Sequence, residues 1–156
     1  MSARDTGRIH SLEIPLVGFS LLVPSAVVAE VANPGALYPV PRAPAWLLGV
    51  MAWRAQPVPL VSFEALTGRP PADISPSSRI VVFYPLAGAP VSAFFGLPSA
   101  IEPRPQGVTA EALQPEDPAA LPDNALIAAG VRIKGRRMLI PDFDALARTL
   151  YPAAAP

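Results

Sequence analysis

Proline interrupts this chain at short intervals, with 22 prolines among 156 residues. A proline lacks the backbone donor and has a fixed φ, so it breaks helices and is excluded from the middle of a sheet. Long helices and long central strands are therefore excluded over most of the sequence. Yet 51% of the residues are hydrophobic, a content that disordered proline-rich chains lack. The combination predicts a mainly β domain of short strands joined by rigid turns.

Apolar runs separated by turn residues predict a series of hairpins, with about seven to ten strands in all. We also expect a short helix over residues 63–68, a helix after the N-cap candidate Asp142, and a helical turn over 25–33 that Ser25 caps. The hairpins pair residues 9–17 with 20–24, 47–53 with 58–63, 79–86 with 90–98 across the turn "AGA", and 125–133 with 137–141.

The domain organisation follows from the proline-rich breaks. We expect one domain over residues 9–150, with flexible tails at 1–8 and 151–156. A polar, proline-rich stretch at 68–79 predicts the break between two halves, and residues 102–124, with five prolines and several acidic residues, predict a long surface loop. Short strands at this spacing favour small β-barrels over one broad sheet.

Composition excludes several classes of partner. Twelve basic and twelve acidic residues give no net charge, so no basic field attracts nucleic acid. No apolar run reaches the roughly 18 residues of a membrane helix, so direct membrane insertion is not expected. The chain has no cysteine, which excludes disulfides and thiolate metal sites. The first residues lack the apolar core of a signal peptide, and we expect a cytoplasmic protein.

Catalytic groups are sparse. The one histidine, His10, has no serine, aspartate or second histidine near it in sequence, and catalysis or metal binding requires such partners. Asp142 and Asp144 fit a helix cap and a first-turn charge better than an acid and base pair. The glycines stand singly and form no phosphate-binding loop. We therefore predict no enzyme activity and no cofactor, and a hydrolase is poorly supported.

Four segments resemble the CheW-like coupling domain of bacterial chemosensory arrays, and the resemblance extends from Ile9 to Leu150. Ala55 and Ser62 depart from the family pattern, which has Gly and Asp there, and "AFFGLPSAIE" replaces the usual "V-D-x-V" strand. "VPLVSFEALTG" is most similar to the ChpC-type members of type IV pilus clusters. The four segments are "LLVPSAVVAEV", "PVPRAPAWLLGVMAWRA", "PVPLVSF" and "GVRIKGRRMLIPDFDALARTL".

The resemblance implies a mainly β, CheW-like fold of two small SH3-like, five-stranded β-barrel subdomains with short helices and an apolar seam. It implies a non-catalytic adaptor that binds the regulatory domain of a CheA-type histidine kinase and the cytoplasmic tip of a methyl-accepting chemoreceptor, with twitching motility as one output. Two alternatives stay open: a receptor-binding modifier without kinase binding, and a small-molecule-binding barrel whose ligand lies between the halves and pairs with Arg54.

Four residues are the candidates for partner binding. The resemblance places Arg54 near the junction of the barrels, where it either contributes to binding or serves as an architectural brace. It places Val28 and Glu30 at a receptor-facing groove, although Val28 also suits the core and Glu30 a solvated turn. Trp46 is either an interface anchor or a core residue, whereas Trp53 is expected in the core.

Overall fold

The computed structural model describes residues 7–152, which form two six-stranded sheets. β4 and β10 have two residues each, so without them each sheet has the five strands that the resemblance implies, and the mainly β fold is confirmed. The first sheet, in the order β10-β11-β12-β2-β1-β9, contains β1 (Arg8–Pro15), β2 (Ser20–Pro24), β9 (Arg104–Thr109), β10 (Gln114–Pro115), β11 (Ile127–Ile133) and β12 (Arg136–Pro141). The second, in the order β3-β7-β8-β6-β5-β4, contains β3 (Val28–Ala32), β4 (Leu37–Tyr38), β5 (Leu47–Trp53), β6 (Gln56–Val61), β7 (Arg79–Phe83) and β8 (Phe95–Ser99).

Four short helices complete the described residues: α1 (Phe63–Leu66), α2 (Phe143–Leu150), and the 3-10 turns η2 (Ser25–Val27) and η3 (Pro118–Ala120). Ser62 and Asp142 are the N-caps of α1 and α2, as each side chain accepts a hydrogen bond from the amide three residues on. The cap predicted for Asp142 is thus confirmed. Within residues 7–152, no helix is long and apolar enough to cross a membrane.

The second sheet is built from one continuous stretch of chain, residues 28–99, which lies between β2 and β9 of the first sheet. Residues 68–79, where we expected a break, connect α1 to β7 inside this stretch. Of the two predicted tails, residues 1–6 and 153–156 lie outside the described residues. Arg8 is part of β1 and pairs with Thr109 of β9.

All four predicted pairings are present: β1 with β2, β5 with β6, β7 with β8, and β11 with β12, each antiparallel. The prediction of the turn in the third hairpin was wrong, however. β8 begins at Phe95 instead of Pro90, so residues 84–94 form a longer connection than the "AGA" turn. Gln56 and Pro57 belong to β6, and the turn before them consists of Arg54 and Ala55 alone.

Two other expectations were wrong. The helical turn over 25–33 stops at Val27, because the β-branched residues that follow pair with β7 as strand β3. Pro24, not Ser25, is its N-cap, and no side chain caps it. Residues 102–124 are not one long loop, since they include β9, β10 and η3. β9 and β10 are edge strands, where proline is tolerated because one side of the strand needs no partner.

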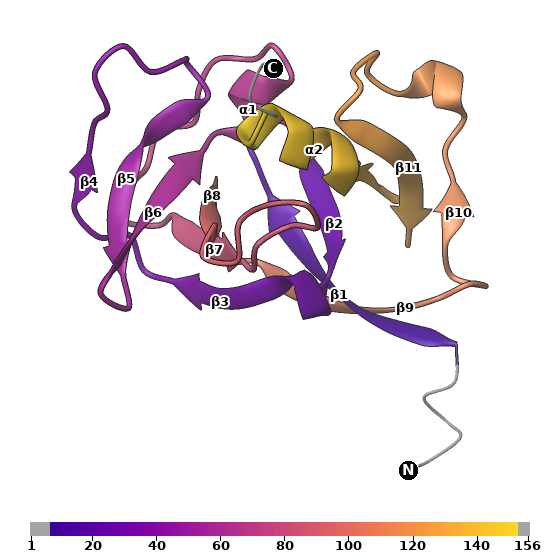
Figure 1. The fold of residues 1–156 in the computed structure, drawn as a ribbon. Coiled ribbons are helices and arrows are strands. Elements are labelled where there is room, and N and C mark those ends of the chain that lie inside the picture. The colour runs from indigo at the N-terminus through magenta and orange to yellow at the C-terminus, as the bar shows by residue number, and fades with distance from the viewer. Residues whose placement is uncertain (1–6, 153–156) are drawn as a thin grey trace.

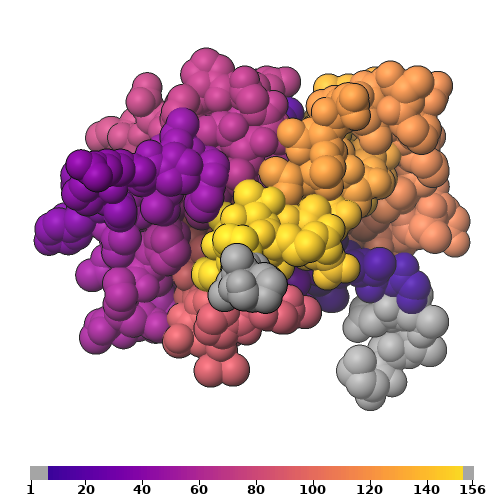
Figure 2. Space-filling view, turned by 45° about the horizontal axis from the view of Figure 1, so that its top comes forward, coloured from indigo at the N-terminus to yellow at the C-terminus, as the bar shows by residue number. Residues whose placement is uncertain are grey.

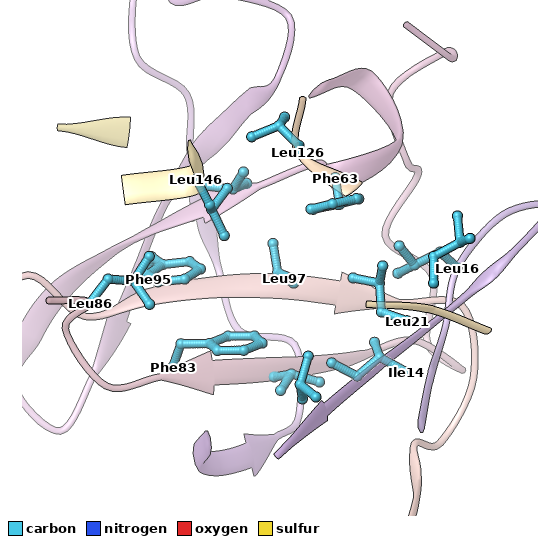
Figure 3. Close-up of a cluster of buried hydrophobic side chains, with 14 of the residues drawn as sticks. Ile14, Leu16, Leu21, Phe63, Phe83, Leu86, Phe95, Leu97, Leu126 and Leu146 are labelled. Atoms are coloured by element: carbon cyan, nitrogen blue, oxygen red, sulfur yellow. The ribbon is translucent and has the colours of Figure 1, made fainter. Parts of the chain in front are cut away.

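The buried side chains form three clusters, one within each sheet and a larger one between the two sheets. β7 shows the reason: Val81 and Phe83 point into the central cluster, whereas Ile80 and Val82 point into the cluster of the second sheet. Figure 3 shows the central cluster, to which α2 contributes Leu146. α2 lies between the two halves of the molecule, in Figure 1 and on the surface shown in Figure 2.

One charged side chain is buried inside the first sheet. Glu13 of β1 is 1% exposed, and its carboxylate accepts a hydrogen bond from Gln106 Nε2 at 3.0 Å and a second from Arg136. Gln106 belongs to β9 and Arg136 to β12. One carboxylate thereby links three strands that come from distant parts of the chain.

Candidate functional site

The β5–β6 hairpin and β3 bring two of the four candidate residues into direct contact. Arg54 Nη2 donates to Glu30 Oε1 at 2.8 Å, and Trp53 Nε1 donates to the same oxygen at 3.3 Å. The Arg54 guanidinium also lies 4.6 Å from the centre of the Trp53 ring. The side chains of Arg54 and Glu30 are 64% and 39% exposed. They form an oriented pair of charges that a partner can reach.

The backbone explains why Arg54 is presented in this way. Arg54 and Ala55 are the two residues of the hairpin turn, and both have positive φ angles, 48° and 62°. Two positive φ angles are typical of the type I′ turn, whose twist matches that of the flanking strands. Positive φ is costly for a residue with a Cβ atom. Alanine at position 55, where the family pattern has glycine, is therefore strained.

Arg54 differs from its expected place. Its ion pair lies within the second sheet, because Glu30 belongs to β3, whereas the resemblance implied the junction of the two halves. Trp53 is buried in the cluster of the second sheet, which confirms the expectation for that residue. Arg54 is therefore engaged with a carboxylate of its own sheet, whereas the small-molecule alternative pairs it with the anionic group of a ligand between the halves.

An aromatic row that the sequence analysis missed continues from this pair. The ring of Phe94 lies 5.2 Å from that of Trp53 and 5.9 Å from that of Tyr84. Tyr84 is 49% exposed. Tyr84 and Phe94 are the first and last residues of the connection between β7 and β8. The aromatic residues in "VFYPL" and "AFFG" were the sequence signal that could have indicated this row. The row extends the surface beside Arg54 with apolar area.

Val28 lies close to the pair but is directed elsewhere. It is half-buried and packs against the central cluster, and it pairs with Phe83 of β7. A β-bulge separates it from Glu30, so the regular alternation of faces is broken between these two residues. Val28 thus combines partial core packing with partial exposure next to the ion pair.

Trp46 lies apart from the other three. It precedes β5, and Arg54 follows that strand, so about 25 Å of extended chain separates them at roughly 3.3 Å a residue. Trp46 is half-buried and lines an apolar pocket of about 120 Å³ together with Leu150 and Tyr151 of the C-terminal helix region. Tyr151 donates its hydroxyl to Ala93 O at 3.3 Å, and burial raises the pKa of its phenol above 10.0.

A second polar cluster, also missed, surrounds α1. The hydroxyl of Ser62 accepts hydrogen bonds from the amides of Ala65 and Ala72, each at 3.1 Å, and donates to Glu64 Oε1 at 3.4 Å. Ser62 and Glu64 are 0% and 1% exposed. The N-cap role explains how serine replaces the aspartate of the family pattern, because either side chain accepts from the helix amides. An aspartate here would face the carboxylate of Glu64.

The described residues hold no recognisable catalytic set. Within residues 7–152, no three His, Asp or Glu side chains lie close enough together to hold a metal ion. His10 is on an exposed part of β1, opposite Gly107. What the arrangement offers is a surface that combines an ion pair, aromatic rings and a partly exposed valine.

Comparison with known proteins agrees with this description. The family model of the CheW-like domain matches residues 14–150. Among solved structures, the scaffolding protein TtCheW from Thermoanaerobacter tengcongensis is similar, with a TM-score of 0.74 and 15% sequence identity over 91% of this chain and 89% of that one. No curated protein matches the chain in a sequence search.

Proposed function

Because the chain belongs to the CheW-like domain family, we propose that it is a non-catalytic adaptor of a cytoplasmic chemosensory array. In this role it couples the cytoplasmic tip of a methyl-accepting chemoreceptor to the regulatory domain of a CheA-type histidine kinase. The fold supports a scaffold, since the structure it is similar to is described as a scaffolding protein.

The single observation that carries the receptor contact is the Arg54–Glu30 pair. Each charge keeps its partner and remains reachable from solvent, while Trp53 and Phe94 supply apolar area next to it. A receptor tip is a helical hairpin, and a helix binds such a surface through an apolar stripe with charges at its margin. Val28, half-buried beside the pair, is the apolar contact that we assign to this surface.

The divergent segment "AFFGLPSAIE" bears on kinase binding. β8 lies in the middle of the second sheet, between β7 and β6. Phe95 and Leu97 fill the central cluster, and Gly96 has no room for a side chain between Ile80 and Leu60. The strand part of the divergent segment, residues 95–99, is therefore buried inside the sheet and is not at either of its edges, β3 and β4. This supports a retained kinase contact over the modifier that binds receptors alone.

The output of the array is a finer proposal. "VPLVSFEALTG", which forms the end of β6 and α1, supports a ChpC-type protein that acts on type IV pili and twitching motility. Deletion of the gene should abolish or reduce twitching on a surface and leave swimming unchanged. Loss of swimming with normal twitching would reassign the output to flagella.

The coupling role is tested by calorimetric titration against two separate probes, a kinase regulatory domain and a receptor tip fragment from the same cell. We expect both probes to bind. Arg54→Ala and Val28→Glu should weaken the binding of the receptor fragment and leave that of the kinase domain unchanged. Arg137→Ala, on the exposed face of β12, is the matched control. Binding of the receptor without the kinase would favour the modifier, and binding of neither would refute the adaptor.

A further inference from the structure

A groove lies between the β1–β2 turn and the chain that follows α1. Its larger part has a volume of about 440 Å³, and the charged residues Glu64, Arg69 and Asp73 line it together with the less polar Val17, Gly18, Pro70 and Pro71. It continues into a smaller cavity of about 160 Å³, which shares Val17, Glu64 and Asp73 and adds the serines Ser75, Ser78 and Ser99. Together they are in the size range of small-molecule sites.

The buried carboxylate of Glu64 lines both parts of the groove. Glu64 is 1% exposed. Its Oε2 accepts a hydrogen bond from the amide of Val17 at 3.1 Å, and its Oε1 accepts a long one from Ser62 Oγ at 3.4 Å. Among residues 7–152, no Lys, Arg or His side chain forms an ion pair with it. A carboxylate has about four acceptor positions, so about half of this one's capacity is unused.

Burial makes this arrangement unusual. A desolvated charge without a counter-charge is costly, so buried carboxylates normally pair with a cation. At this site the counter-charge is missing from the described chain, while space for one is present. Asp73, exposed on the same groove, adds a second negative charge, and the hydroxyl of the 2%-exposed Ser78 adds a polar wall. Both features favour a positively charged occupant.

The basic side chain that lines the groove is held by other partners. The guanidinium of Arg69 lies 4.8 Å from the centre of the Phe19 ring and donates to Val17 O at 3.4 Å. It approaches Gly18 so closely that a Cβ atom on Gly18 would lie 2.3 Å from Arg69 Nη1. Arg69 thus lines the groove but is engaged with Phe19 and Val17, and it forms no ion pair with Glu64.

We propose that this groove binds a guanidinium or ammonium group, which donates hydrogen bonds to Glu64 and is neutralised by Glu64 and Asp73. The group belongs either to a free small molecule or to an arginine or lysine side chain of a polypeptide. The site involves α1 and the β1–β2 turn and does not include the Arg54–Glu30 surface, so the inference does not depend on the adaptor role.

The test is an NMR titration of the full chain with n-propylguanidine, using n-propylurea as the neutral analogue of the same shape. The amide of Val17 is the reporter, because it donates to Glu64. We expect saturable shifts of this amide with propylguanidine and none with propylurea. Glu64→Gln, which keeps an acceptor for Val17, should weaken binding at least tenfold, and Asp73→Asn two- to fivefold.

Equal responses to the two compounds, or an unchanged Kd in Glu64→Gln, would overturn the proposal. Should Glu64→Gln fail to fold, Asp73→Asn decides, and an unchanged Kd in that variant overturns it as well. The source is identified with the peptide Ac-Ala-Arg-Ala-NH2 against its citrulline counterpart. Peptide binding at least tenfold tighter than that of propylguanidine identifies a polypeptide side chain, and weaker peptide binding identifies a free amine or guanidine.

Discussion

Arg54 donates to a carboxylate oxygen of Glu30, 24 residues before it in the sequence, and the indole of Trp53 donates to the same oxygen. Because the ring of Trp53 is also the surface on which the guanidinium rests, the three side chains hold one another in a single geometry. An exposed pair of this kind adds little to folding. Its value is therefore expected in recognition, where a fixed direction of charge matters.

Loss of either charge should separate folding from binding. We expect Arg54→Ala and Glu30→Ala to lower the free energy of unfolding by less than about 1 kcal/mol, since the pair is exposed. Affinity for the receptor tip should fall about tenfold or more. Urea unfolding and calorimetry measure the two effects. The exchange Glu30→Arg with Arg54→Glu should not restore binding, and full restoration would show that the pair is only a brace.

Ala55 should be improved by glycine. Left-handed φ costs an L-residue about 1–2 kcal/mol, and the extra entropy of glycine in the unfolded chain returns about 0.4–1 kcal/mol of that. Because Ala55 lies at φ 62°, Ala55→Gly should raise the free energy of unfolding by roughly 0.5–1 kcal/mol. Urea unfolding measures this gain. The matched change Ala52→Gly, at the exposed position of β5, should be destabilising. A loss of stability in Ala55→Gly would contradict the strain.

Arg136 should matter more than its neighbour Arg137. Arg136→Met leaves the buried carboxylate of Glu13 without its cation, and a buried pair broken on one side costs several kcal/mol. Since the Arg136 side chain is 47% exposed, we expect a smaller loss of about 2 kcal/mol. Arg137 donates only to Ala120 O, so Arg137→Met should change stability by less than about 0.5 kcal/mol. Equal losses would refute the role of Glu13.

Ionisation of Tyr151 should lower the stability of the fold in strong alkali. Burial raises the pKa of its phenol above 10.0, so the folded state retains the proton longer than the unfolded state does. Well below pH 10 both states are protonated, so the tyrosine adds no dependence of stability on pH. As the pH rises beyond 10, the unfolded state loses its proton first and stability falls. Unfolding free energies of Tyr151→Phe should decline less steeply in this range, and parallel curves would contradict the assignment.

The two N-caps provide a comparison within one molecule. Asp142 accepts one amide bond from Ala145, so Asp142→Ala should cost about 1 kcal/mol. Ser62 is buried, accepts two amide bonds and donates to Glu64, so Ser62→Ala should cost about 2–3 kcal/mol. Thermal unfolding of the two variants measures both losses of stability. A smaller loss in Ser62→Ala than in Asp142→Ala would show that the buried network contributes nothing beyond the cap.

Local features were predictable from the sequence. The four hairpins follow from apolar runs and turn residues close together in the chain, and the cap of α2 from one polar residue, Asp142, before an apolar stretch. β9 was missed because its partner β1 is far away in the sequence, and only that pairing makes a strand of "RPQGVT". For the same reason the sequence named Arg54 and Glu30 but did not show that they touch.

The buried cluster around α1 had no comparable signal. Glu64 follows Phe63 in a short amphipathic helix, a position that usually faces water, and its burial depends on the β1–β2 turn that packs over it through Val17. The pattern of one segment does not reveal which other segment covers it. Sequence reasoning therefore identified the exposed Arg54 and Glu30 and missed the two buried carboxylates, Glu13 and Glu64.

The nested order of the two sheets has a consequence for synthesis on the ribosome. β1 and β2 leave the exit tunnel first, but β9 to β12, their partners in the first sheet, follow only after residues 28–99. The strands of the second sheet can thus pair completely while four strands of the first are still missing. Until then, the apolar face of the β1–β2 hairpin has only the second sheet to pack against, so the seam between the halves can form before the first half is closed.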